Sequence, residues 1–143
     1  MGDRWHPWRH AGEHHPEVLI NTQVELPDKV WGLQAGKRIW LCRKLDQVRR
    51  RCTLTHEIVH LERGPVPEEP VARAREELAV SIEASRRLIP LPDLIDALKW
   101  TRDPVELADC LWVDHPTLKI RMNCLDPIET AELEFHLEDR WIP

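Results

Sequence analysis

The stretch RCTLTHEIVHLERG, residues 51–64, places two histidines four positions apart, with a glutamate directly after the first. Residues four apart in an α-helix share one face, so His56 and His60 can direct their imidazoles at one metal ion. Glu57 lies on the neighbouring face, where it can take a proton from a water molecule that the ion activates. This HExxH spacing indicates metal-dependent hydrolysis. The alternative is a buried helix whose histidines bond to backbone carbonyls, because chance can also produce the motif.

A catalytic zinc ion needs a third protein ligand and one open position. Cys52 follows the same line of the helix, but it lies eight positions from His60, about 12 Å along the axis, which is too far. The next helix offers Glu76, Glu77 and Glu83. Glu77 lies beside the predicted hydrophobic stripe and on a line with small residues, whereas Glu76 points further out. Glu77 is therefore the predicted ligand, and Glu83 either lines the same cleft or is solvated.

The elements that must position these residues are a small sheet and two long helices. Segments rich in β-formers predict three short strands in a mostly antiparallel sheet, at 17–25, 30–33 and 38–42. Asp46 is the expected N-cap of the helix that carries the motif, which ends at about Glu62 before Gly64. A second long helix is predicted over 71–90, with a core stripe of Val71, Ala74, Leu78, Ile82 and Ile89.

The chain is predicted to be a single α+β domain, residues 1–143, in three parts. Residues 1–16, with two tryptophans, four histidines and two prolines, are expected to form an irregular arm. Residues 17–90 hold the catalytic core and residues 91–143 a helical part. In the helical part, Asp-Pro-x-Glu signals at 103–106 and 126–129 predict helix starts, and 103–125 has the outline of a helix-turn-helix.

The charge distribution and the cysteines indicate the kind of partner and the cellular compartment of the protein. Residues 1–90 carry 15 Lys and Arg against 13 Asp and Glu, whereas residues 91–143 carry 5 against 12. The acidic C-terminal part disfavours nucleic acid and suits a basic protein partner, or it is a solvated coat. The four cysteines form no CxxC pair, and no stretch has the length of a membrane span or the pattern of a signal peptide. A cytoplasmic protein with free thiols is expected.

Two quoted stretches resemble the ImmA/IrrE family of small metallopeptidases. They are GKRIWLCRKLDQVRRRCTLTHEIVHLERG, residues 36–64, and EELAVSIEASRRLIP, residues 76–90. The resemblance extends over roughly residues 17–125. It implies a zincin-like fold, a Zn²⁺ ion bound by His56, His60 and Glu77, and Glu57 as the catalytic base.

The chain departs from the family pattern in two places. Relatives often carry Asp or Asn four residues after the ligand glutamate, where it can orient the first histidine; this chain has Ser81. The chain also has no tyrosine, so a histidine, an arginine or a backbone N–H would have to stabilise the oxyanion. His115 and His136 are candidates for that role, although a surface or capping position explains each of them as well.

Family resemblance further implies a protein substrate, a helix-turn-helix repressor whose cleavage derepresses a mobile element, prophage or stress regulon. The substrate is expected to add a strand along the sheet edge at RIWLC, residues 38–42, while the acidic segment meets its basic surface. Two other functions remain open. One is a catalytically inactive zinc fold that binds a repressor as a sensor or anti-repressor. The other is a DNA-binding module over 103–125, although its second helix holds only Lys119 and Arg121 as basic residues.

Overall fold

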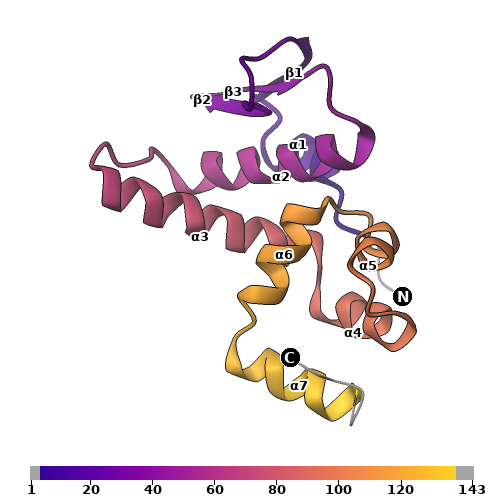
Figure 1. Ribbon diagram of the computed structural model, residues 1–143. Helices are drawn as coiled ribbons and strands as arrows, with labels where there is room; N and C mark the ends of the chain where they lie inside the picture. Colours follow the sequence, from indigo (N-terminus) through magenta and orange to yellow (C-terminus); the bar gives the residue numbers. More distant parts are fainter. Residues whose placement is uncertain (1–3, 138–143) are drawn as a thin grey trace.

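The computed structural model describes residues 4–137, so the ends of the predicted arm and of the predicted acidic segment lie outside the described residues. Three strands form one sheet, which lies on one side of α2 (Gln47–Arg63), while α3 (Pro70–Leu88) runs along another side (Figure 1). The helices that follow α3 gather around its C-terminal end. The described part of the chain is therefore an α+β structure organised around α2.

The sheet is mixed and has the strand order β1-β3-β2. β1 (Leu19–Val24) runs parallel to β3 (Arg38–Cys42), and β2 (Gly32–Ala35) pairs with β3 in the antiparallel sense. Three strands are present as predicted, although the second is displaced from 30–33 to 32–35. The prediction of a mostly antiparallel sheet is wrong. The hairpin of β2 and β3 turns β3 back beside β1, so that β1 and β3 run in the same direction.

The prediction that RIWLC is a sheet edge is also wrong, because β3 is the central strand. Ile39 and Leu41 are fully buried, and they pack with Leu54 and Ile58 of α2 in one hydrophobic cluster. A strand with this many apolar side chains gains most from having a neighbour on each side. The edges of the sheet are therefore β1 and β2.

The N-terminal segment is a helix where an irregular arm is expected. α1 (Pro7–His14) begins with a proline, which fits the first helical turn because its missing N–H has no partner there. Ala11 is buried in the same cluster as the sheet, and α1 packs on α2. Just before α1, the indole Nε1 of Trp5 donates to the Thr55 hydroxyl at 2.8 Å. These contacts join the start of the chain to the helix that carries the HExxH motif.

α2 begins and ends as predicted. The Asp46 side chain accepts from the backbone N–H of Arg49 at 2.8 Å, and Gly64 has a φ of 96°, which favours glycine. Along α3, however, the predicted core stripe is largely wrong. Val71 is 58% exposed and Leu78 is 50% exposed, because α3 turns a different face to α2, on which Val80 and Ala84 pack against Val59. The first turns of α3 also extend past the sheet (Figure 1). The buried positions on α3 are instead Val80, Ala84, Ser85 and Leu88.

Four further helices complete the described chain: α4 (Leu91–Trp100), α5 (Pro104–Leu111), α6 (His115–Asn123) and α7 (Pro127–Leu137). They share one hydrophobic cluster, and the helix-turn-helix outline of α5 and α6 is confirmed. Arg121 of α6 is 2% exposed; it pairs with Glu129 of α7 and donates from Nε to the Ile89 carbonyl at 2.8 Å. No helix among residues 4–137 has the length and apolar character needed to cross a bilayer.

Candidate metal centre

The two histidines of the HExxH motif lie one turn apart on α2 and face the same way. Their ring centroids are 4.9 Å apart with an interplanar angle of 71°. His60 is buried, whereas the His56 side chain is 30% exposed. Burial and the neighbouring His60 lower the pKa of His56, although Glu77 acts in the opposite direction. Neutral imidazole is the form that binds metal ions.

Glu77 brings a carboxylate from α3 to this pair. Its Oε2 lies 3.1 Å from Nε2 of His60 and 3.5 Å from Nε2 of His56. One ligand atom from each of the three residues lies within 4.8 Å of the others, so the group could hold one metal ion. The predicted convergence of these three residues is thus present in the structure.

The other two glutamates of α3 point to different partners. Glu76 receives two hydrogen bonds from the Arg63 guanidinium, at 2.7 and 3.0 Å. Glu83 lies 3.2 Å from Nη2 of Arg87, one turn along the same helix. Glu76 and Glu83 therefore each contact an arginine, and Glu77 alone of the three reaches the histidines.

Glu57 is the buried carboxylate of the group. Its residue is only 7% exposed, and burial together with the charge of Glu77 raises its pKa to about 7. Strand β2 passes directly over it, because Gly32 carries no side chain. A Cβ at Gly32 would meet Thr53 Cγ2 at 2.6 Å and the Glu57 side chain at 3.3 Å.

Gly32 is a further residue beside the candidate site, and the HExxH motif does not predict it. The signal was present, because an isolated glycine inside a predicted strand often marks a close backbone approach. Lacking a side chain there, β2 can lie against the helix face that holds Thr53 and Glu57. The glycine thereby brings the strand next to the candidate base.

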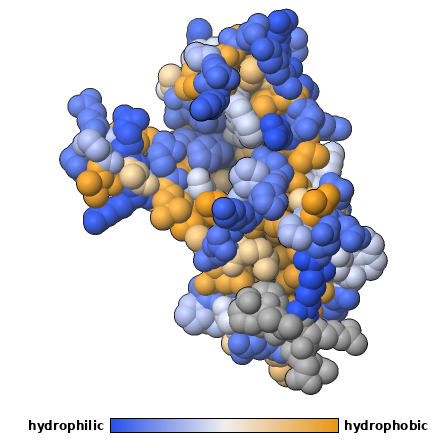
Figure 2. All heavy atoms as spheres, viewed as in Figure 1, coloured by the Kyte–Doolittle hydropathy of each residue, from blue (hydrophilic) through white to orange (hydrophobic). Residues whose placement is uncertain are grey.

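A cleft of about 1010 Å³ opens beside the three candidate ligands. It lies between the sheet and α3, where the surface in Figure 2 is hollowed, and the first turn of α6 closes one end. His56, Glu57, His60 and Glu77 all line it. Two imidazoles and one carboxylate with an open side are a donor set that fits a catalytic zinc ion.

Of the three remaining candidate site residues, one lines the cleft and two do not. Ser81 lines it, one turn after Glu77 on α3. His115 is exposed at the first position of α6, next to Asp114 and Pro116, which line the cleft. His136 is exposed near the end of α7, where it lies 3.3 Å from Glu132 and is not among the residues that line the cleft.

Two imidazoles from one helix, a carboxylate from the next and a glutamate beside the first imidazole define the metallopeptidase class whose signature is HExxH. Residues 11–121 match the family model Peptidase_M78, described as the IrrE N-terminal-like domain. The chain therefore belongs to the ImmA/IrrE family of metallopeptidases.

No curated protein and no solved structure matches the chain.

Proposed function

We propose that this protein is a zincin-like, zinc-dependent endopeptidase that cuts a protein substrate within the cleft beside α2. The observation that carries the proposal is the position of Glu77 Oε2, which lies within 3.5 Å of both imidazoles of the HExxH motif. When bound there, zinc would lower the pKa of a water molecule and polarise the carbonyl of the scissile bond. Membership of a metallopeptidase family supports the same assignment.

In this proposal the residues of the cleft have two separate roles, metal binding and proton transfer. His56, His60 and Glu77, which line the cleft, would hold the ion. Glu57, adjacent in sequence to the first ligand and lining the same cleft, accepts a proton from the attacking water and returns it to the leaving amine. β2 covers Glu57 on one side, which limits access of bulk water to that carboxylate.

The negative charge that develops on the substrate carbonyl needs a partner, and the chain has no tyrosine to supply one. Among the described residues that line the cleft, the two cationic side chains are Lys29 and Arg73. Arg73 lies one turn before Glu77 on α3, and we assign it this role over His115, which does not line the cleft.

The edge of β2 is the place where an extended substrate segment would bind. All four residues of β2 line the cleft, and its ladder with β3 occupies only one side of the strand. A peptide that adds a strand there would run directly past the metal ligands. This edge replaces residues 38–42, which lie in the middle of the sheet.

A helix-turn-helix repressor is the proposed substrate, as the resemblance to the family implies. Exposed acidic residues on the helices after α3 support a basic partner: Asp96, Asp103, Glu106, Asp109, Glu132 and Glu134. If they contact the repressor, raising the salt concentration should weaken its binding, since exposed charges are screened. A binding affinity that is insensitive to salt would remove this part of the proposal.

The DNA-binding alternative loses support from the structure. Arg121, one of the two basic residues of α6, is buried against Glu129, so only Lys119 remains exposed on that helix. Binding to phosphates needs several cations on one accessible face. The inactive binder remains the second candidate, and it shares the metal site.

Substitution of Glu57 by Gln tests the proposal. The variant should still bind one zinc ion in the cleft and still bind its helix-turn-helix repressor substrate, but cleavage should fall by at least about 100-fold. Glu76→Gln is the matched control, because Glu76 pairs with Arg63 outside the metal site. If neither the wild type nor either variant cuts the repressor that they bind, the chain is a binder and the catalytic proposal is wrong.

A further inference from the structure

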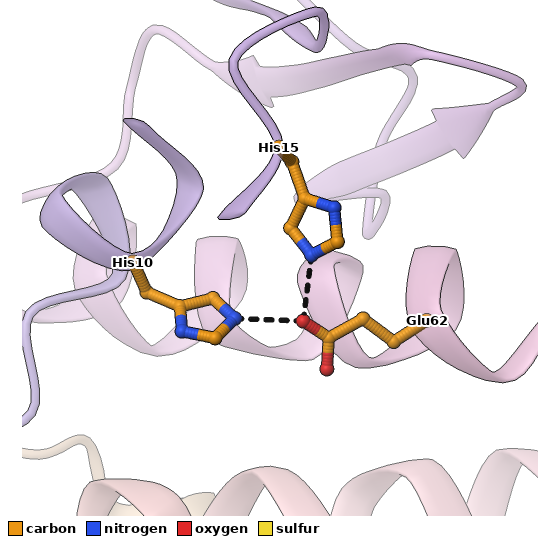
Figure 3. A group of neighbouring side chains, drawn as sticks. All are labelled: His10, His15 and Glu62. Atoms are coloured by element: carbon orange, nitrogen blue, oxygen red, sulfur yellow. Dashed lines mark hydrogen bonds and ion pairs between the residues drawn. The ribbon is translucent and has the colours of Figure 1, made fainter. Parts of the chain in front are cut away.

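A second cluster of metal-binding side chains lies outside the cleft, on the face of α2 that α1 covers. Nε2 of His10 and Nε2 of His15 each lie 2.7 Å from the same atom, Oε2 of Glu62 (Figure 3). One ligand atom from each residue lies within 4.8 Å of the others. The cluster thus joins α1 and the residue after it to the last turn of α2.

The cluster is separate from the candidate catalytic centre. Glu62 follows His60 by two positions, and two positions on a helix turn the side chain by about 200° to the opposite face. None of His10, His15 and Glu62 is among the residues that line the cleft. An ion bound here would therefore share no ligand with the first site and would lie outside the cleft.

The surroundings hold the carboxylate in the orientation that a metal ligand needs. Nη2 of Arg87 donates to Oε1 of Glu62 at 2.6 Å, which leaves Oε2 directed at the two imidazoles. The ring of Trp5 packs against His10 at 4.7 Å between centroids, and the Arg87 guanidinium lies over the same indole at 5.5 Å. Partners of this kind, behind the ligands, set the orientation of side chains in metal sites.

The donor set selects the class of ion. Two imidazole nitrogens and one carboxylate oxygen suit Zn²⁺ and similar first-row divalent ions better than Mg²⁺ or Ca²⁺, which prefer oxygen alone. The three side chains are only partly exposed, at 20%, 21% and 23%, so the site is shielded yet open to one further ligand from solvent. Ligand distances near 2 Å require the donor atoms to separate slightly from their present spacing, which small rotations of the rings allow.

We propose that His10, His15 and Glu62 bind a divalent transition-metal ion, Zn²⁺ in the first instance, which fastens α1 to the end of the HExxH helix. The site uses two of the four histidines in the first fifteen residues, none of which has a part in the proposed peptidase activity. Because its ligands come from segments about fifty positions apart, the ion would stabilise the folded chain.

The test is the zinc content of the full chain after dialysis against micromolar Zn²⁺, measured by native mass spectrometry and elemental analysis. The wild type should hold two ions, the His60→Ala and His15→Gln variants one each, and the double variant none. His14→Ala is the matched control and should keep two, because His14 is exposed and outside the trio. Circular dichroism checks that each variant is folded.

His15→Gln is chosen because the glutamine amide can still donate a hydrogen bond to Glu62 while lacking the imidazole nitrogen. Zinc should raise the melting temperature of His60→Ala by several degrees and leave that of the double variant unchanged, which a purely structural hydrogen bond would not do. If His15→Gln does not fold, the zinc-dependent rise in the melting temperature of His60→Ala decides whether the second site binds zinc.

If the wild type binds only one ion and His60→Ala removes it, the second site is wrong. His10, His15 and Glu62 then form only a pair of hydrogen bonds. If the wild type binds only one ion, and His15→Gln removes it while His60→Ala keeps it, the proposed catalytic centre is wrong instead. The two failures are therefore distinguishable.

Discussion

Replacing Gly32 by alanine tests how closely the sheet must approach α2, the helix that carries the HExxH motif. The new Cβ would meet Cγ2 of Thr53 at 2.6 Å and the side chain of Glu57 at 3.3 Å. Ordinary van der Waals contact begins at 3.4 Å, so β2 and α2 must separate by about 0.8 Å. The Thr53 side chain cannot easily move aside, because branching at Cβ restricts its χ1 angle and its backbone is held in α2.

This separation should cost both stability and activity. Overpacking by one methyl group in a packed interface costs roughly 1–3 kcal/mol. A displacement near 1 Å beside a catalytic group can lower the rate by about 100-fold. Zinc binding should be unchanged, because the nearest atoms to the added methyl group belong to Thr53 and Glu57 and not to the ligands His56, His60 and Glu77.

Urea unfolding followed by circular dichroism gives the change in stability, and cleavage of the repressor gives the change in kcat/KM. Gly12→Ala is the control, since a Cβ at Gly12 meets nothing within 4 Å and α1 accommodates alanine. Adding Thr53→Ser removes the obstructing methyl group, so the double variant should recover most of both losses. Unchanged stability and activity in Gly32→Ala, or no recovery in the double variant, would refute this account of the contact between β2 and α2.

Two further predictions concern named carboxylates. Glu77→Gln should weaken zinc binding in the cleft by at least about 100-fold in a chelator competition, while Glu76→Gln leaves it unchanged; equal effects would contradict the assignment of Glu77. Hydrogen bonding to Arg121 lowers the pKa of Glu129 to about 2 from an ordinary value of 4.5, although burial acts in the opposite direction. The stability that this pair contributes is therefore fully present above about pH 4.5 and is lost as the pH falls towards 2. The loss should be about 3 kcal/mol. Urea unfolding should show it in the wild type and not in Glu129→Gln. The same pH dependence in both proteins would contradict it.

The parts of the site that follow from local structure could be predicted from the sequence. His56 and His60 share a face because the helix that Asp46 caps has a fixed period, and no distant contact is needed to know it. Glu77 lies beside the two histidines as its position in the pattern predicts. The hydrophobic stripe predicted from Val71 to Ile89 is not the buried face of α3, because Val71 and Leu78 are exposed.

The strand order and the close contacts could not be predicted, because they depend on which segments pack together. Three short strands allow several orders, and only packing on α2 makes β3 the central one. The first residues appeared irregular because histidine and proline have weak preferences for regular structure, whereas burial of Ala11 against the sheet favours a helix there.

The sequence by itself therefore determined the helix of the HExxH motif, its caps and the two candidate ligands that it carries, since these depend on neighbours within a few positions. Tertiary structure alone decided that β2 is the free edge beside the cleft, that Gly32 lies against Glu57, and that His10 and His15 meet Glu62. Each of these contacts joins segments far apart in the chain, and such contacts form only when the hydrophobic clusters assemble.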